Sequence, residues 1–237
     1  MDFRRYDKIV EYYPTMWPLL VPGYLPLFGA MLEIVRSMAH KPKDLLDLGC
    51  GPASATIAIA PACAADTLVT LVDGSTNMLQ AARQQLGDHV STTFVGDFTR
   101  HEVIRDACPD RCYDLILCTF ALHHIPDTHK RQVIEYMAHA LRPGGLLLLA
   151  DEVTIDHPGG WKVIEHVRAR IIREHLDAGH IDPGFWHIET HHEPDTVLPF
   201  LPARIDDMTS WMARGGLGVS CPMHLWGSAL LIGLRGE

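Results

Sequence analysis

The chain has 237 residues, 47% of them hydrophobic, which suits one α/β domain with a well-buried core. Its formal charge of -9 at pH 7 offers no overall attraction for a phosphate backbone, so no nucleic-acid partner is expected. The 6 Cys residues show no Cys-x-x-Cys spacing, and no apolar run approaches the ~20 residues that span a bilayer. We therefore expect reduced thiols, a cytoplasmic location and no membrane partner.

The first forty residues (1–40) are predicted to form an N-terminal helical lid. Helical apolar spacing covers residues 2–13, and a further helix is expected over residues 27–38. Between them, four prolines interrupt an aromatic, apolar stretch that cannot be one straight helix, because an interior proline removes a donor and clashes with the preceding turn. Two interpretations stay open: a lid over a ligand site, or a segment that simply covers one face of the sheet.

Residues 44–153 alternate between short apolar strands and helices, a pattern that predicts a parallel sheet with helices on both faces. The expected strands are 44–48, 68–73, 90–95, 113–119 and 146–153, and the expected helices between them include 54–63 and 76–86. Right-handed crossovers are the default for such units. This segment is the predicted core of a single domain that spans residues 1–237.

The remainder of the chain is predicted to decorate that core. Residues 154–204 form a His-rich helical cap insertion, with helix expected over 160–192. Residues 205–237 then supply a helix over 206–214 and two strands, 219–225 and 228–234, that can pair as a terminal hairpin.

Glycine and acidic residues lie at the carboxyl ends of the predicted strands, where open α/β sheets bind ligands. A Gly-x-Gly turn, Gly49 to Gly51, joins the first strand to its helix and permits close approach of a ligand to the backbone. Asp73 closes the second strand and can accept hydrogen bonds from the two hydroxyls of a ribose, or simply initiate the following helix. Asp97 follows the third strand.

Taken in order, the motifs resemble those of class I S-adenosylmethionine (SAM) dependent methyltransferases over residues 44–153. The sequence motifs on which the resemblance rests are Asp47-Leu48-Gly49-Cys50-Gly51-Pro52, Val72-Asp73, Gly96-Asp97, Tyr113-Asp114-Leu115-Ile116 and Leu141-Arg142-Pro143-Gly144-Gly145. The resemblance implies a Rossmann-like, seven-stranded α/β sheet whose last strand is antiparallel, with SAM as cofactor. An NAD-binding domain is the rival for the first two motifs, but Ser54, Gly96-Asp97 and the Pro-Gly-Gly turn favour SAM.

The same resemblance implies roles for individual residues. The Gly49 to Gly51 turn takes the methionine part of SAM, Asp73 the ribose, and Asp97 with Phe98 the adenine. Thr119 and Phe120 would line the pocket near the methionine and methyl ends. The full set expected to bind the cofactor is Asp47, Gly49, Cys50, Gly51, Asp73, Gly74, Met78, Asp97, Phe98, Thr119 and Phe120.

Acceptor chemistry is expected from residues beyond strands four and five and on the covering segments. We predict catalytic roles for His124, Glu152 and His187, and substrate contacts for Trp17, Tyr24, His123 and His191. Each also has a plain structural interpretation: a helix cap for the His pair, a solvated strand end for Glu152, and core packing for the aromatic residues.

The stretch 185–193 is the most unusual part of the predicted cap. On a helix, His187 and His191 are four residues apart and face the same way, a spacing that can hold a divalent metal. Most such pairs bind nothing, so no metal is assigned and a direct role with the substrate is preferred.

The function that this pattern favours is transfer of a methyl group from SAM to O or N of a small-molecule substrate. Short words at 21–24 and 226–231 resemble the carboxymethyl-SAM synthase subgroup, whereas residues 179–204 depart from it. The alternatives are therefore an enzyme that consumes SAM without methyl transfer, through aminobutyl-chain cyclisation or carboxymethyl-SAM chemistry, and a non-catalytic SAM-binding regulator. A homodimer is left open.

Overall fold

The computed structural model describes residues 3–154, 157–191 and 198–236, and it centres on one seven-stranded sheet. The strands are β1 (Asp44–Leu48), β2 (Leu68–Asp73), β3 (Val90–Val95), β4 (Tyr113–Thr119), β5 (Leu141–Glu152), β6 (Leu217–Leu225) and β7 (Ser228–Arg235). Their order is β3-β2-β1-β4-β5-β7-β6. The first five run parallel, and β7 is antiparallel to both β5 and β6. The predicted α/β fold with one antiparallel strand is confirmed.

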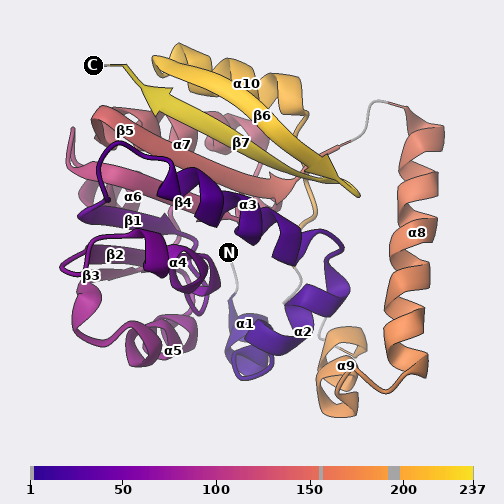
Figure 1. Ribbon diagram of the computed structural model, residues 1–237. Helices are drawn as coiled ribbons and strands as arrows, with labels where there is room; N and C mark the ends of the chain where they lie inside the picture. Colours follow the sequence, from indigo (N-terminus) through magenta and orange to yellow (C-terminus); the bar gives the residue numbers. More distant parts are fainter. Residues whose placement is uncertain (1–2, 155–156, 192–197, 237) are drawn as a thin grey trace.

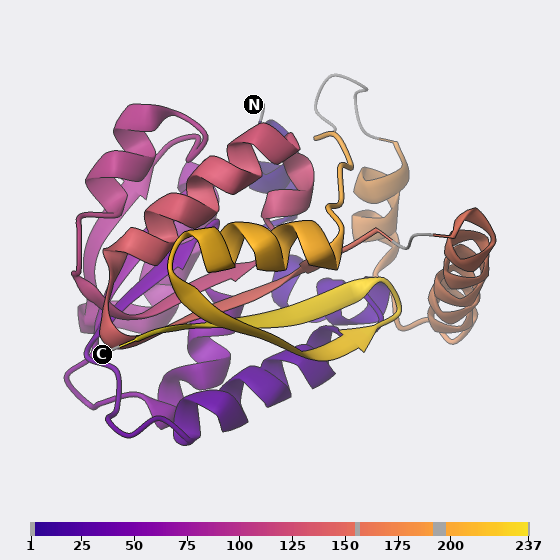
Figure 2. The same ribbon diagram turned by 90° about the horizontal axis from the view of Figure 1, so that it is seen from above.

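Helices cover both faces of this sheet, as Figure 2 shows. One face is covered by α3 (Tyr24–Arg36), α4 (Ser54–Ile59) and α5 (Thr76–Leu86), and the other by α6 (His101–Ala107), α7 (Asp127–Ala140) and α10 (Ile205–Arg214). Successive strand residues point to opposite faces, so Leu45 joins the first core while Leu46 joins the second. Each buried leucine stabilises the fold by about 1.5–3 kcal/mol.

Four further helices gather beyond the carboxyl ends of the parallel strands (Figure 1). They are α1 (Arg4–Ile9), α2 (Tyr13–Leu20), α8 (Pro158–Asp177) and α9 (Pro183–Thr190). A small third core, with Ile9, Ile181 and Phe185 at its centre, joins α1 and α9 to Met78 of α5. The described parts of the N-terminal segment and of the cap insertion thus meet over the same edge of the sheet.

The N-terminal helices differ from the prediction in their boundaries. The expected helix over 2–13 is wrong, because α1 ends at Ile9 and a turn separates it from α2, which carries Pro14 in its first turn. Pro18 lies inside α2, whereas the break falls at residues 21–23, and α2 and α3 meet at 107°. The absence of one straight helix is confirmed. The helix expected over 27–38 begins three residues earlier, at Tyr24.

Other boundaries also differ. The helix expected over 54–63 ends at Ile59 as α4, and a 3₁₀ turn, Ala60–Ala62, follows around Pro61. β6 begins at Leu217 rather than at 219. β5 begins at Leu141 rather than 146, because Leu141 already pairs with Tyr113 before the register shifts. The helix expected over 160–192 is split into α8 and α9 near Gly179, which has φ +69; His192 lies outside the described residues.

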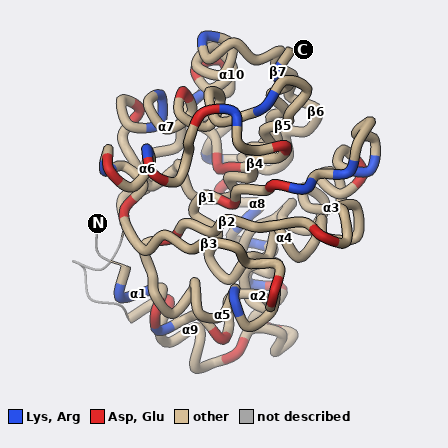
Figure 3. Tube along the Cα trace, turned by 90° about the vertical axis from the view of Figure 1, so that its left-hand side faces the viewer, with Lys and Arg blue, Asp and Glu red and all other residues tan. Residues whose placement is uncertain are grey.

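Positive and negative side chains are interspersed along the trace (Figure 3). Within residues 3–154, 157–191 and 198–236, no single helix is long and apolar enough to cross a membrane. Only the bent pair α2 and α3 meets the length and composition required, and only when the two are taken together.

Candidate active site

The turn after β1 is held close to the end of β2. The backbone N–H groups of Gly49 and Cys50 both donate to the Val72 carbonyl, at 2.8 and 3.0 Å. Gly49 has φ +70, and a Cβ added there would lie 2.6 Å from the Cβ of Ala121. Glycine at this position therefore permits both the left-handed backbone and the close approach of the next loop.

Asp73, the last residue of β2, ties this turn to the start of α5. Its carboxylate accepts hydrogen bonds from the backbone N–H of Gly51 and of Ser75, each at 2.8 Å. Burial raises the pKa of Asp73 above its ordinary value, although these hydrogen bonds oppose the rise. The side chain is thus fixed at the edge of the cavity beside the glycine turn.

The first cavity lies over the glycine turn and measures about 60 Å³. Its walls come from the ends of β1 and β2, from the loops after β3 and β4, and from the N-terminal segment. The N-terminal segment closes it tightly, since a Cβ added at Gly74 would lie 2.3 Å from the Phe3 ring. Ligand pockets for small molecules usually measure about 300–1,000 Å³. The space over the turn is therefore largely filled by the chain itself.

Seven of the residues predicted to bind the cofactor line this first cavity: Gly49, Gly51, Asp73, Gly74, Met78, Phe98 and Phe120. Four others do not. Asp47 is buried beneath the turn, where burial raises its pKa to about 7 and Thr56 donates to its Oδ2 at 2.7 Å. The buried Cys50 thiol, Thr119 at the end of β4, and Asp97 also stay off the lining.

Asp97 is held by its own loop. Its Oδ1 accepts from the backbone N–H and the hydroxyl of Thr99, at 2.9 and 2.6 Å. Burial acts to raise the pKa of Asp97, but these hydrogen bonds outweigh it and the pKa falls below the ordinary value.

The lining suits the adenosine and methionine parts of SAM in chemical type. Asp73 is a carboxylate acceptor for hydroxyl groups, Phe98 offers an aromatic wall, and the glycine turn leaves its backbone open to a ligand. These residues fit the group once the N-terminal segment gives up the space that it fills.

A second cavity of about 460 Å³ adjoins the first. The side chains that line both cavities are Tyr6, Tyr13, Phe120 and His124. The second cavity reaches from the ends of β4 and β5 to α2, α8 and α9. Its aromatic lining is Tyr6, Tyr13, Trp17, Phe120, Trp186 and Phe200.

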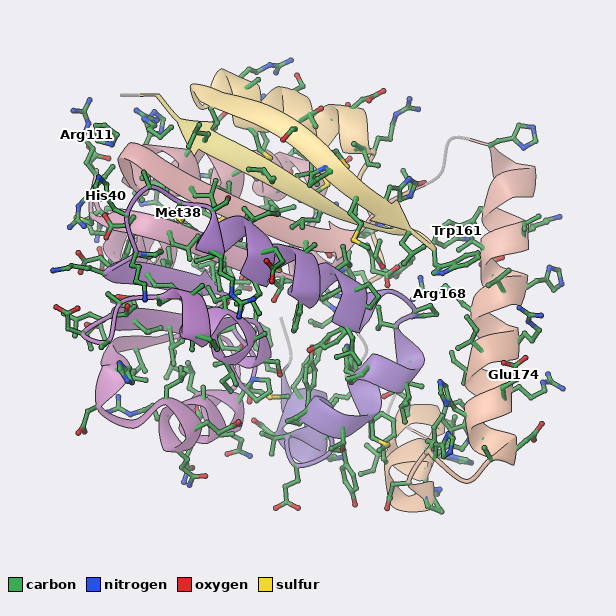
Figure 4. All side chains as sticks on the ribbon, in the orientation of Figure 1. Met38, His40, Arg111, Trp161, Arg168 and Glu174 are labelled. Carbon is green, nitrogen blue, oxygen red and sulfur yellow. The ribbon has the colours of Figure 1, made fainter. Side chains whose placement is uncertain are left out.

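Two Arg–Glu pairs cross the second cavity's wall. Arg168 of α8 binds both oxygens of Glu152, at 2.5 and 2.8 Å, and Glu152 is 4% exposed. Figure 4 shows Arg168 and Trp161 projecting from α8 toward the body of the molecule. Arg5 of α1 forms a salt bridge with Glu189 of α9 through one contact, from Nη2 to Oε1. The predicted catalytic carboxylate at 152 is therefore committed to a salt bridge.

His123 and His124 follow β4 and have different partners. His123 Nδ1 lies 2.5 Å from Asp151 Oδ1, and the backbone N–H of His123 donates to Oδ2 of the same carboxylate at 3.1 Å. His124 Nδ1 lies 3.0 Å from the Pro199 carbonyl, which can only accept, so Nδ1 carries the proton. Its Nε2 is then an acceptor, and the Tyr6 hydroxyl donates to it at 3.0 Å.

The electrostatics keep this imidazole neutral. Burial lowers the pKa of His124 to about 4, and the neighbouring His123 adds to the effect. At neutral pH, His124 therefore presents an unprotonated Nε2 at the boundary of the two cavities.

The other residues predicted for the acceptor divide into two groups. Trp17 lines the second cavity together with His123, His124 and Glu152. Tyr24 does not; it is 4% exposed and packs in the core against Phe120, with ring centroids 5.3 Å apart. His187 and His191 are exposed, stack on each other at 4.5 Å and lie off the lining. No group of three or more potential metal ligands is found in the described part of the chain.

Sequence reasoning missed Arg5, Tyr6 and Arg168 as site residues. Tyr6 falls within the helical apolar spacing of residues 2–13, a pattern that predicts packing rather than a site role. Nothing in the sequence tells which carboxylates the two arginines meet across the cap. The bonds that bring them together join residues far apart in the chain.

Comparison with known proteins places the fold in a family. Residues 45–145 match the model of a methyltransferase domain. The carboxy-S-adenosyl-L-methionine synthase of Chromohalobacter salexigens is 32% identical over 66% of this chain and 58% of its own length. That of Pseudoalteromonas translucida is 26% identical over 66% of the chain and 64% of its own length. The chain thus spans less than two thirds of these two relatives.

Solved structures agree at the level of fold. The complex of DhpI with S-adenosylhomocysteine superposes with a TM-score of 0.64 at 19% identity, covering 100% of this chain and 96% of that one. The match over residues 45–145 and this chain's own seven-stranded sheet lead to one conclusion: the chain is similar to the class I SAM-dependent methyltransferases in its central segment and in its fold.

Proposed function

We propose that this protein transfers a methyl group from SAM to an oxygen or nitrogen of a small molecule held in the second cavity. The observation that carries the proposal is the shared wall. Four side chains, Tyr6, Tyr13, Phe120 and His124, line both the cavity over the glycine turn and the larger aromatic cavity. A cofactor in one and an acceptor in the other would be neighbours, as methyl transfer requires.

The residues on either side divide the work. SAM, when bound, supplies a methyl group already activated on a sulfonium. Asp73 and the glycine turn hold the cofactor, and the aromatic lining excludes water from the acceptor. His124 Nε2, neutral and fixed in its tautomer by Pro199, takes the proton that the acceptor loses.

The similarity to carboxy-SAM synthases supports a second candidate, in which SAM is converted into a modified SAM rather than used as a methyl donor. This reaction and methyl transfer place the same demands on the glycine turn and Asp73. The two reactions differ in their products: methyl transfer gives a methylated acceptor, and the second candidate gives a modified SAM.

Product identity tests the proposal. The enzyme is incubated with SAM, with and without a panel of hydroxyl- and amine-bearing small molecules, and the products are identified by mass spectrometry. Methyl transfer predicts S-adenosylhomocysteine together with an acceptor heavier by one methyl group, and neither without acceptor. Methylthioadenosine or a carboxylated SAM would contradict it. Replacing His124 by Gln should lower kcat by about 10²–10⁴-fold for a hydroxyl acceptor.

A further inference from the structure

The charged groups that face the second cavity balance one another. Arg5 and Arg168 contribute two positive charges, and Glu152 and Glu189 contribute two negative charges. The pairing is direct in both cases: Arg168 binds both oxygens of Glu152, and Arg5 contacts Glu189. His124 faces the same space, and His123 meets Asp151. The wall therefore offers polar contacts but no excess positive charge among the described residues.

This balance disfavours an anionic ligand. A carboxylate entering the cavity would meet two guanidinium groups whose charges Glu152 and Glu189 already balance. To take the place of Glu152, which is 4% exposed, it would have to separate that buried carboxylate from Arg168. Separating a buried pair leaves an uncompensated charge, which is strongly unfavourable. An uncharged ligand needs no such separation.

The aromatic lining indicates a flat molecule. Tyr13 and Trp17 stack with ring centroids 4.5 Å apart, and Trp17 meets Phe185 edge-on. Phe200 covers the His123 side, with ring centroids 5.7 Å apart, and is 49% exposed. Rings arranged in this way favour a planar aromatic ligand through offset and edge-to-face contacts.

The phenol ring of Tyr6 lies where the two cavities meet. The Tyr6 hydroxyl donates to His124 Nε2 at 3.0 Å, and Tyr6 lines both cavities. The site thus accommodates a phenolic ring whose oxygen meets the proton acceptor.

We propose that the acceptor is an uncharged phenol, bound among the aromatic rings with its hydroxyl on His124 Nε2 in the place of Tyr6. The inference rests on the proposed methyl transfer and names its substrate class. The phenolic oxygen forms the new C–O bond, the methyl–sulfur bond breaks with its electron pair staying on sulfur, and the phenolic proton passes to His124 Nε2. The products are a methyl ether and S-adenosylhomocysteine.

The test uses two acceptors of one shape that differ in charge, para-coumaramide and para-coumarate. With the full-length enzyme and SAM, para-coumaramide should be methylated on its hydroxyl with kcat/KM higher by about tenfold or more than para-coumarate. The same order is expected for binding by calorimetry to enzyme saturated with S-adenosylhomocysteine. This comparison needs no variant and so does not depend on one folding.

A variant then tests the cause. Glu152→Gln removes the negative charge that pairs with Arg168, so the ratio of the affinity for para-coumarate to that for para-coumaramide should rise by about tenfold relative to wild type. Glu174→Gln lies on the same helix with a side chain 66% exposed and is the matched control, expected to change neither.

The outcomes separate this inference from the proposed function. If SAM is used for methyl transfer but para-coumarate is the equal or better ligand, the charge argument is overturned and methyl transfer stands. If neither compound binds or is methylated, the phenol assignment is overturned. If SAM is converted to a carboxylated or chain-cleaved product with both phenols unmethylated, the proposed function fails and this inference fails with it.

Discussion

His124 shows how two hydrogen bonds and burial set the chemistry of one side chain. Pro199 fixes the proton on Nδ1, Tyr6 occupies Nε2, and burial favours the neutral ring. The sequence indicated a His pair after the fourth strand. The sequence does not indicate which of the two His side chains lies at the boundary of the cavities. That position depends on contacts with Pro199 and Tyr6, which are far from His124 in the sequence.

The lowered pKa of His124 has a measurable consequence. Its pKa falls from 6.5 to about 4, so the neutral base persists as pH drops through 6. We expect the acid limb of kcat/KM to lie near pH 4 rather than near 6.5, measured with SAM and a hydroxyl acceptor. The stability that the neutral ring contributes is present above pH 6.5 and is lost as pH falls toward 4. A limb near 6.5 would exclude this buried His124 as the base.

The protonation of Asp47 makes the stability of the fold depend on pH in the opposite direction to that of His124. Burial raises its pKa to about 7, so the folded chain holds its proton more tightly than the unfolded chain, and stability falls as pH rises from about 4 to 7. Asp47→Asn removes this dependence, and its free energy of unfolding relative to wild type should increase by on the order of 2 kcal/mol between pH 5 and pH 8.

Urea unfolding at the two pH values measures the difference for Asp47→Asn. The matched control is Asp88→Asn at an exposed position, for which the difference should not depend on pH. A pH-independent difference for Asp47→Asn would show that Asp47 ionises normally in the folded chain.

At the scale of elements, α1 connects the cofactor side to the acceptor side. Phe3 packs against Gly74, Asp7 accepts a hydrogen bond from the Ser75 hydroxyl at 2.5 Å, and Tyr6 meets His124. The sequence predicted an N-terminal helical lid over 1–40 and a separate helical cap over 154–204, and for the first segment two interpretations were open. Phe3 and Tyr6 line the cavity over the glycine turn, and the role of a lid stays a prediction.

Phe3→Ala should ease cofactor entry. The first cavity measures only about 60 Å³ with Phe3 in place, so SAM must displace that ring. Without the ring, the competent state is more populated, and the apparent affinity for SAM should rise by about threefold to tenfold, with faster association in stopped-flow measurements.

Lys8→Ala, at an exposed position of the same helix, is the control for Phe3→Ala and should leave both values unchanged. Weaker SAM binding by Phe3→Ala would mean that the ring is part of the cofactor site rather than a barrier to it.

At the scale of the molecule, the sheet was predictable and the cap was not. β1, β2, β3 and β4 have the predicted boundaries, because each is a short apolar run between turn residues that no distant contact needs to specify. The helices of the cap depend on packing between segments far apart in the sequence, as in the contact of Ile9 with the core around Phe185. Local periodicity cannot reveal such contacts.

In the candidate site, too, the part built from local motifs was predictable and the part built from distant segments was not. Its cofactor side uses residues within one βα unit after another, and ordered motifs located seven lining positions, among them Gly49 and Asp73. Its acceptor side combines β4 and β5 with α1, α2, α8 and α9. The prediction there found Trp17 and the His pair, but it also chose His187 and His191, which the fold of α9 leaves exposed.

The most direct test of the account is calorimetric titration of SAM into wild type, Asp73→Ala and Asp88→Ala. Asp73 lies on the cavity, and Asp88 is exposed after α5. Binding to wild type and Asp88→Ala with the same affinity, and a loss of about tenfold or more for Asp73→Ala, is the result expected if this cavity receives the cofactor. Equal affinity in all three proteins would contradict it.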